Sequence, residues 1–369
     1  MVNDSLPEHA ATPPQPESGQ SSSQQEGLVV ALAPGLFEVV AADGTSWLCT
    51  LRGRLRKQRP MRPPVPSSRR QASSSPQQAV LRQQPVDDAP DAPAEAPTRV
   101  APGDRVHFTP LGNGEGVIED LVPRHRVLAR ARPEVGTEQV LLANPDQAVL
   151  VFAMREPAPH FGLLDRYLAL CEHAHVPAII CLNKDDLGEP DEVVAAERIY
   201  CALGYEVLRT SATTGDGLDA LRQHLAGRIS LLTGPSGVGK SSLMNTIISD
   251  ARQRTGEIST ATGKGRHTTT GVRLLPLPEG GWLADSAGIR ELSLWKVPSE
   301  ELPRCFVELR DAAGNCEYED CTHGLDEDGC ALRAVLIEGR ITPERYASFQ
   351  RLLDEARDDE GPAWEHKGR

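Results

Sequence analysis

Residues 234–241, with the sequence GPSGVGKS, constrain this chain most, because they match the phosphate-binding pattern G-x-x-x-x-G-K-[ST]. An apolar run, ISLLT, precedes them, and the residues from Ser241 on, SSLMNTIIS, have helical spacing. Backbone N–H groups of such a loop surround phosphates, its lysine neutralises the β- and γ-phosphate charge, and its serine ligates Mg²⁺. The predicted nucleotide-binding residues of this loop are Gly234, Pro235, Ser236, Gly237, Val238, Gly239, Lys240, Ser241 and Ser242.

A second motif indicates which base is bound. Residues 183–186, NKDD, end the apolar run PAIICL and match the guanine-reading pattern N-K-x-D. Asp186 can accept the N1–H and exocyclic amino protons of guanine, Lys184 would pack over the base, and Asn183 would tie this loop to the phosphate loop. Ser211 and Ala212, after the next apolar run, fit the short motif that supports guanine by backbone contact. The alternative is a polar turn that happens to contain aspartate.

Two segments near the phosphate loop are candidates for magnesium binding and for switching. Residues 285–288, DSAG, follow the apolar GWLA, so that Asp285 would hold Mg²⁺ through water and Gly288 would donate its N–H to the γ-phosphate. GTPases usually carry D-x-P-G here, and Ala287 departs from that pattern. Residues 263–270, GKGRHTTT, have the composition of a conformational switch, in which one threonine would complete the magnesium shell; Thr269 is our choice among them.

The order of these motifs differs from that of an ordinary GTPase, which runs from phosphate loop to switch threonine, D-x-x-G and N-K-x-D. Here the guanine motif precedes the phosphate loop. A circular permutation moves the chain termini while it keeps every strand in place. Apolar runs such as AVLVFAM and YEVLRTS alternate with amphipathic stretches, which predicts a doubly wound α/β fold. We therefore expect a circularly permuted P-loop GTPase domain over residues 142–297.

The first third of the chain predicts a different architecture. Residues 1–26 are polar and Pro-rich and are expected to be disordered. Over residues 27–141, short β-like runs, the last being RVLARA, predict a small β-barrel of the oligonucleotide-binding (OB) type. A Pro/Gln/Arg-rich insert at about 58–98 should interrupt this barrel without structure of its own.

Net charge and hydropathy limit the kinds of partner and the location that can be expected. The net charge of −13 argues against a nucleic-acid partner, but residues 52–70 carry eight basic residues and no acid. That run is either a contact for a phosphate backbone or a solvated charge run. Because the chain has no run of about eighteen apolar residues and no signal-peptide pattern, we expect no membrane span and a cytoplasmic location.

Three cysteines and a histidine crowd together in the last part of the chain. Cys316, Cys321, His323 and Cys330 form a Cys₃His set, which is typical of a closed, structural Zn²⁺ site. The alternative is free thiols near an unrelated histidine. We expect a helical zinc-binding module over residues 298–369. Six acids surround the ligands, which argues against this module holding phosphates by charge alone.

Together these motifs resemble the ribosome small-subunit-dependent GTPase A family of circularly permuted bacterial GTPases. The resemblance covers about residues 27–56 and 99–357, with stretches such as NPDQAVLVFAM, CLNKDDL, GPSGVGKSSLMN and CEYEDCTHGLDEDGCALRAV. It implies an OB barrel, a permuted GTPase domain and a zinc module with the four ligands above. It also implies a monomer that binds GTP, GDP and ribosomal RNA, and late maturation of the small ribosomal subunit, with GTP hydrolysis stimulated by that subunit.

The catalytic residue and two rival functions stay open. Ile289 occupies the position where many GTPases place a glutamine that orients water, so intrinsic hydrolysis should be slow. His267 is the candidate to position the water, and the alternative is a hydrogen bond that holds the switch. Lys240 and Gly288 would stabilise the transferring phosphate. The rivals are a P-loop NTPase of other purpose and a nucleotide-gated RNA-binding module with little turnover.

Overall fold

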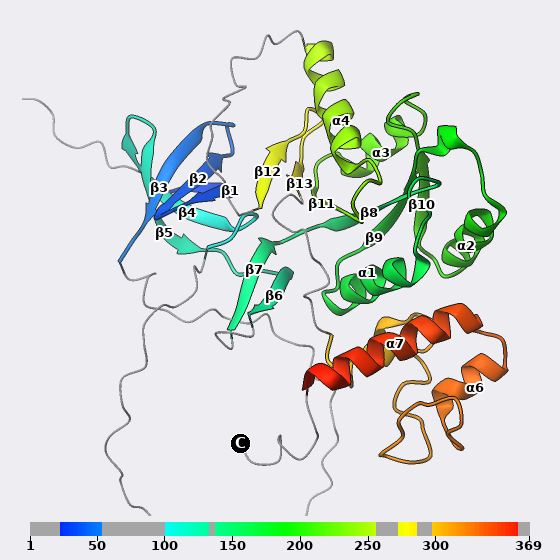
Figure 1. Ribbon diagram of the computed structural model, residues 1–369. Helices are drawn as coiled ribbons and strands as arrows, with labels where there is room; N and C mark the ends of the chain where they lie inside the picture. Colours follow the sequence, from blue (N-terminus) through cyan, green and yellow to red (C-terminus); the bar gives the residue numbers. More distant parts are fainter. Residues whose placement is uncertain (1–22, 54–99, 133–136, 256–271, 286–296, 361–369) are drawn as a thin grey trace, which may run out of the picture.

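The computed structural model describes residues 23–53, 100–132, 137–255, 272–285 and 297–360 (Figure 1). The predicted insert at 58–98 and nearly all of the predicted N-terminal tail lie outside these residues. Within them, no helix combines the length and the apolar character needed to cross a membrane.

Five strands near the N-terminus form a closed barrel. They are β1 (Gln25–Ala33), β2 (Leu36–Ala41), β3 (Ser46–Leu51), β4 (Arg105–Gly112) and β5 (Glu115–Leu121), in the order β1-β2-β3-β5-β4. β3 pairs with β5 in parallel, and the other pairs, including β1 with β4, are antiparallel. Alternate residues such as Val39, Cys49 and Phe108 fill the interior. The predicted OB-type barrel is therefore confirmed.

One predicted barrel run lies elsewhere. Strand β6 (Val127–Arg132), which contains all of RVLARA but its first residue, pairs with β7 (Thr137–Ala143) in a separate two-stranded sheet. Leu128 and Leu142 are buried in the core of the following α/β domain and not in the barrel interior. The barrel is complete with β5, so the apolar side chains of β6 are buried in the core of the α/β domain instead.

A six-stranded sheet forms the centre of the molecule, with the order β10-β9-β8-β11-β13-β12. Its strands are β8 (Gln147–Ala153), β9 (Ala178–Asn183), β10 (Glu206–Thr210), β11 (Ile229–Thr233), β12 (Arg273–Pro276) and β13 (Trp282–Asp285). All neighbours are parallel except β12 and β13. β8 and β11 are buried along their whole length, as expected of central parallel strands.

Helices cover both faces of this sheet (Figure 1). Helix α1 (Phe161–His173) and α2 (Asp191–Ala202) contribute to one hydrophobic core, whereas α3 (Leu218–Leu225) and α4 (Lys240–Thr255) contribute to the other. A 3₁₀ turn, η1 (Asp185–Leu187), follows β9. Together with the strand order, this arrangement is the predicted doubly wound α/β domain.

The C-terminal module consists of α5 (Leu302–Cys305), α6 (Ala331–Ile337), α7 (Pro343–Glu360) and the loops between them. Helix α7 packs against α1 and α5, and Phe306 and Phe349 belong to the same core as Leu164 of α1. The module therefore shares a continuous hydrophobic core with the α/β domain.

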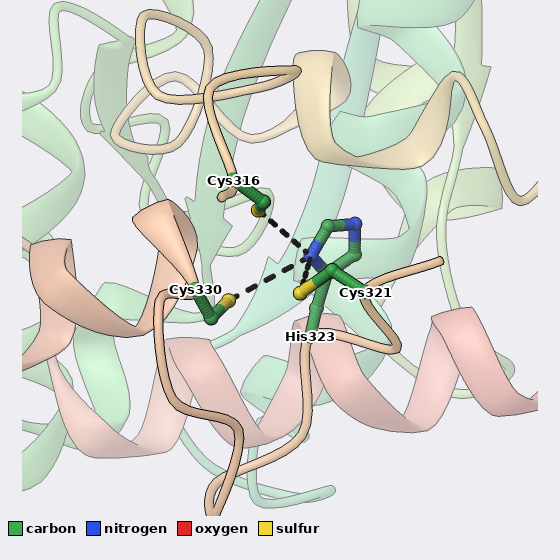
Figure 2. Close-up of side chains that lie close together, drawn as sticks. All are labelled: Cys316, Cys321, His323 and Cys330. Atoms are coloured by element: carbon green, nitrogen blue, oxygen red, sulfur yellow. Dashed lines mark hydrogen bonds between the residues drawn. The ribbon is translucent and has the colours of Figure 1, made fainter. Parts of the chain in front are cut away.

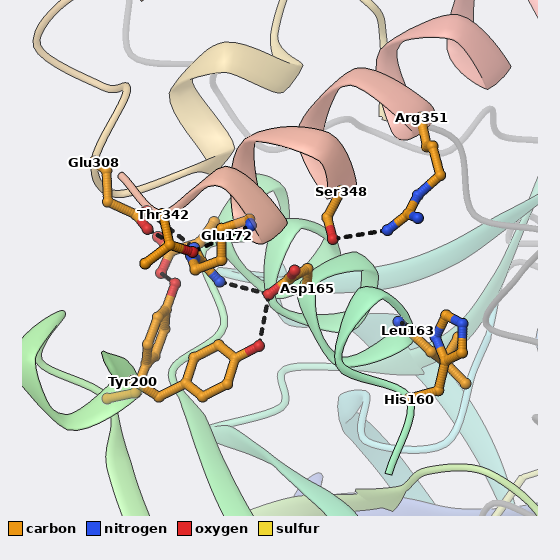
Figure 3. Close-up of polar contacts among 11 residues, drawn as sticks. His160, Leu163, Asp165, Glu172, Tyr200, Glu308, Thr342, Ser348 and Arg351 are labelled. Carbon is orange, nitrogen blue, oxygen red and sulfur yellow. Dashed lines mark hydrogen bonds and ion pairs between the residues drawn. The ribbon is translucent and has the colours of Figure 1, made fainter. Parts of the chain in front are cut away.

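A buried ion-pair network also joins the module to α1. The Arg345 guanidinium of α7 donates to Asp165 Oδ1 of α1 at 2.5 Å and to both carboxylate oxygens of Glu308. Tyr200 donates its hydroxyl proton to Asp165 at 2.7 Å. Figure 3 shows Asp165, Glu308 and Tyr200 close together. The guanidinium lies 5.3 Å from the ring centres of Tyr200 and Phe306. Every charge in this network therefore has a partner inside the interface.

Candidate functional site

The predicted nucleotide-binding residues gather at one edge of the sheet. Asn183 ends β9, Ser211 follows β10, and Gly234 follows β11, all at carboxyl ends of parallel strands. The chain proceeds from β8 to β9 and β10 on one side and then returns to β11 on the other side of β8. Such a point of reversal creates a crevice outside the strand ends, where doubly wound proteins bind ligands.

The phosphate loop requires glycine at its two ends. Gly234 has φ +149°, and a Cβ there would lie 2.0 Å from the Val151 carbonyl oxygen. Gly239 has φ +95°, and a Cβ there would lie 2.3 Å from Nδ2 of Asn183. Neither position tolerates a side chain, because the neighbouring atoms already touch the backbone. The glycines thus allow the loop to pack against β8 and the guanine motif.

The predicted phosphate-binding side chains lie where the loop enters a helix. Lys240 is the first residue of α4, and its Nζ donates to the carbonyl oxygens of Gly234 at 2.8 Å and Pro235 at 2.6 Å. The ammonium group therefore lies inside the loop. Ser241 and Ser242 are exposed in the first turn of α4. Free N–H groups at a helix N-terminus favour a bound anion, so this end of α4 suits a phosphate.

Asn183 connects three parts of the site. Its Nδ2 donates to the Val238 carbonyl of the phosphate loop at 2.8 Å. Its Oδ1 accepts from the Thr210 hydroxyl at 3.2 Å and from the Ala212 N–H at 3.3 Å. The side chain is 1% exposed, so these bonds are shielded from water. Asn183 thus makes the connection between the guanine motif and the phosphate loop that the motif predicts.

Asp186 is held by the residue after β10. The Ser211 hydroxyl donates to Asp186 Oδ1 at 2.6 Å and accepts from the N–H groups of Thr213 and Thr214. A hydroxyl that receives two backbone protons is fixed in orientation. One carboxylate oxygen of Asp186 is therefore fixed by the protein, which orients the carboxylate.

Lys184 is positioned by a loop that sequence reasoning missed. Lys184 adopts a left-handed conformation, with φ +63°, and its Nζ donates to the Glu156 carbonyl. The next residue, Pro157, lies beside the phosphate loop, since its Cδ is 3.7 Å from the position of a Cβ on Gly237. This loop follows β8 directly at the point of strand reversal, which is the signal that could have identified it.

The predicted magnesium and catalytic residues are described only in part. Asp285 ends β13, in register with Leu232 of β11, so its backbone lies at the same edge of the sheet as the phosphate loop. His267, Thr269 and Gly288 lie outside the described residues, and so does Ile289.

The four predicted metal ligands converge on one point. The ligand atoms of Cys316, Cys321, His323 and Cys330 lie within 4.8 Å of one another. Figure 2 shows the four side chains pointing toward one another. The three sulfur atoms lie 3.5, 3.4 and 3.7 Å from Nδ1 of His323, respectively. Zn–S bonds of about 2.3 Å and Zn–N bonds of about 2.0–2.1 Å place sulfur and nitrogen about 3.6 Å apart in a tetrahedron. The geometry therefore fits a Zn²⁺ bound through Nδ1.

The surroundings support these ligands. The His323 carbonyl, in a residue with φ +60°, accepts from the hydroxyl of Tyr346 and from Gln350 on α7. Burial and the nearby Arg357 charge lower the pKa of His323, which favours the neutral imidazole that binds metals. The Cys330 sulfur caps α6 by accepting from the Arg333 N–H. These hydrogen bonds hold the ligand residues against α6 and α7.

Comparisons with known proteins agree with this geometry. Residues 121–295 match the family model for the RsgA GTPase. A small ribosomal subunit biogenesis GTPase RsgA from Moorella thermoacetica is 40% identical over 321 residues, which cover 87% of this chain and 94% of that protein. The crystal structure of YjeQ from Thermotoga maritima gives a TM-score of 0.63 at 27% identity, over 90% of this chain and 99% of that one. The structure of YloQ, a circularly permuted GTPase, gives a TM-score of 0.65 at 24% identity, over 93% and 99% of the two chains, and shows the fold. The chain belongs to the RsgA family of GTPases, as its motifs predicted.

Proposed function

We propose that this protein binds GTP at the edge of its central sheet and hydrolyses it to GDP and phosphate. The observation that carries the proposal is the hydrogen-bonded frame of Asn183 and Ser211, which orients Asp186 beside the phosphate loop. An acceptor-only carboxylate suits the N1–H and amino protons of guanine, whereas adenine offers a different pattern. Lys240 would neutralise phosphate charge from within its loop.

In this proposal, Mg²⁺ enters with the nucleotide, and Ser241, Thr269 and Asp285 are the residues that would hold it. Mg²⁺ supplies neutralisation of charge on the β- and γ-phosphate oxygens. His267 would orient the attacking water, and Gly288 would donate its N–H to the γ-phosphate. Because Ile289 cannot hydrogen-bond water, turnover would depend on a partner that completes the site.

We infer that the partner is the small ribosomal subunit and that the reaction serves its maturation, with contacts to ribosomal RNA. The support is the RsgA relative, a small ribosomal subunit biogenesis GTPase, which aligns over most of both chains. An OB barrel is a fold that binds oligonucleotides, and the basic run after β3 would extend such a surface. The division into a tail (1–26), barrel region (27–141), GTPase domain (142–297) and zinc module (298–369) belongs to this proposal, as do a cytoplasmic location and a monomeric state.

The test is GTP turnover by the purified protein, alone and with saturating small ribosomal subunits, with ATP as the control nucleotide. We expect slow basal hydrolysis that rises steeply with subunits and is absent with ATP. A turnover that ignores subunits would remove the ribosomal assignment and leave the guanine site intact. Association with subunits that is equal in GTP and GDP would favour the rival function, an RNA-binding module with little turnover in which the nucleotide only fixes the shape.

The base assignment has its own test. Asp186→Asn replaces one acceptor oxygen by a donor amide, which suits the N1 and C2 groups of xanthine better than those of guanine. We therefore expect this variant to prefer xanthosine over guanosine diphosphate, measured by competition binding. An unchanged preference would favour a P-loop NTPase of other purpose.

A further inference from the structure

Three successive residues, the last two of β10 and the one that follows it, contact three different residues of the guanine motif. Ser211 and Thr210 hydrogen-bond to Asp186 and Asn183, as described above. The residue before them, Arg209, places Nη1 4.0 Å from Asp185 Oδ1. β9 and β10 pair in parallel with Thr210 opposite Asn183, so the strand register brings these residues together.

The Arg209 side chain contacts acidic residues from both ends of η1 and from α2. Its Nε donates to the two carboxylate oxygens of Glu197 on α2, at 3.1 and 3.0 Å, and its Nη1 lies 3.0 Å from Glu189 Oε1. Glu189 follows η1, while Asp185 begins it. One guanidinium therefore links β10, α2 and both ends of the turn that contains Asp186. Arginine suits this role because its planar fork can bind several carboxylates at once.

The charge balance around the loop depends on this residue. Asp185 Oδ1 is a buried atom that has no hydrogen-bond partner among the described residues, and the Arg209 guanidinium is the cation beside it. Without that cation, Asp185, Glu189 and Glu197 would repel one another next to Asp186. Repulsion within a turn this short is relieved by moving the turn, which would move Asp186 away from the position set by Ser211.

We propose that Arg209 is a positioning residue for guanine recognition: it neutralises three acids around η1 and thereby fixes the carboxylate of Asp186 against the base. The proposal rests on the proposed reading of guanine by Asp186. Arg209 itself contacts neither base nor phosphate in this scheme, so its effect is on the choice of base and not on the chemical step.

The experiment compares the affinities of the full-length protein for GDP and IDP by calorimetry. IDP lacks the exocyclic amino group, so the GDP-over-IDP preference measures how well Asp186 reaches that group. We expect Arg209→Gln to reduce the preference roughly 2- to 30-fold, the usual range for residues that act through a neighbour. Arg209→Lys keeps the charge and should recover part of the preference. Arg166→Gln is the matched control, because Arg166 is 24% exposed against 29% for Arg209 and also pairs with a glutamate.

The outcomes separate this proposal from a general structural role and from the proposed function. Equal losses of GDP and IDP affinity in Arg209→Gln would overturn it, as would a preference equal to that of the Arg166→Gln control. If Arg209→Gln does not fold, Arg209→Lys is compared with the wild type instead; lysine lacks the planar fork that binds several carboxylates, so a preference equal to that of the wild type also overturns the proposal. A wild-type protein that binds GDP, IDP and ADP equally would instead refute guanine reading itself.

Discussion

Replacement of Arg345 by methionine should weaken the packing of the C-terminal module on α1 and so lower the free energy of unfolding. The side chains of Asp165 and Glu308 are 2% and 3% exposed, and Arg345 is the cation that neutralises both. Removal of one partner from a buried ion pair costs about 3–5 kcal/mol, because a charge stays buried without compensation. Methionine preserves most of the volume and the contacts with Tyr200 and Phe306, so the loss should come from the unpaired carboxylates.

The loss of stability in Arg345→Met should depend on pH. Burial already raises the pKa of Asp165 above the ordinary 3.8, although the Arg345 charge opposes this shift. Without Arg345, the folded state would favour protonated Asp165 more strongly. A carboxyl group with a raised folded-state pKa destabilises the fold as pH rises above its unfolded value, because the folded chain then binds more protons. The variant should therefore lose less stability at pH 5 than at pH 8.

The assay is urea unfolding followed by circular dichroism at both pH values. Arg310→Met is the control, because Arg310 and Glu172 form a pair that is 47% and 28% exposed and worth at most about 1 kcal/mol. A triple variant, Arg345→Met with Asp165→Asn and Glu308→Gln, should recover part of the stability by removal of the stranded charges. Equal losses in Arg345→Met and Arg310→Met, or a loss independent of pH, would refute the argument.

Three further predictions concern the two binding sites. Gly239→Ala forces a Cβ to 2.3 Å from Asn183 Nδ2 and should weaken GDP binding by about tenfold or more, whereas Gly53→Ala, with no atom within 4 Å of its Cβ, should have no effect in the same titration. Cys330→Ser should lose the metal in native mass spectrometry and open the loop 316–330 to proteolysis while GDP affinity is retained; a retained metal would contradict the assigned ligand set. His267→Ala should lower subunit-stimulated turnover far more than nucleotide affinity, and equal losses would exclude a catalytic role.

The sites could be predicted from the sequence where their residues are close together along the chain. The phosphate loop and the N-K-x-D motif are each a single continuous stretch of sequence. The four candidate metal ligands fall within residues 316–330, so the spacing of these residues was enough to identify each site. The contacts of Arg209 and Arg345 could not be predicted, because their partners come from other elements. Asp165 and Arg345 are far apart in sequence, and only the packing of α7 on α1 brings them to 2.5 Å. The prediction that RVLARA belongs to the barrel was wrong for the same reason. Alternation of apolar and polar residues identifies a strand but not the hydrophobic core in which that strand is buried.

The packing of the C-terminal module also determines how motion can pass through the chain. Val297 is buried in the core that the module shares with α1. The buried ion pairs of Arg345 with Asp165 and Glu308 join the module to α1. Helix α1 in turn packs against β8, and Gly234 of the phosphate loop lies against Val151 of that strand. A displacement of the C-terminal module would therefore strain the sheet that carries the nucleotide-binding residues.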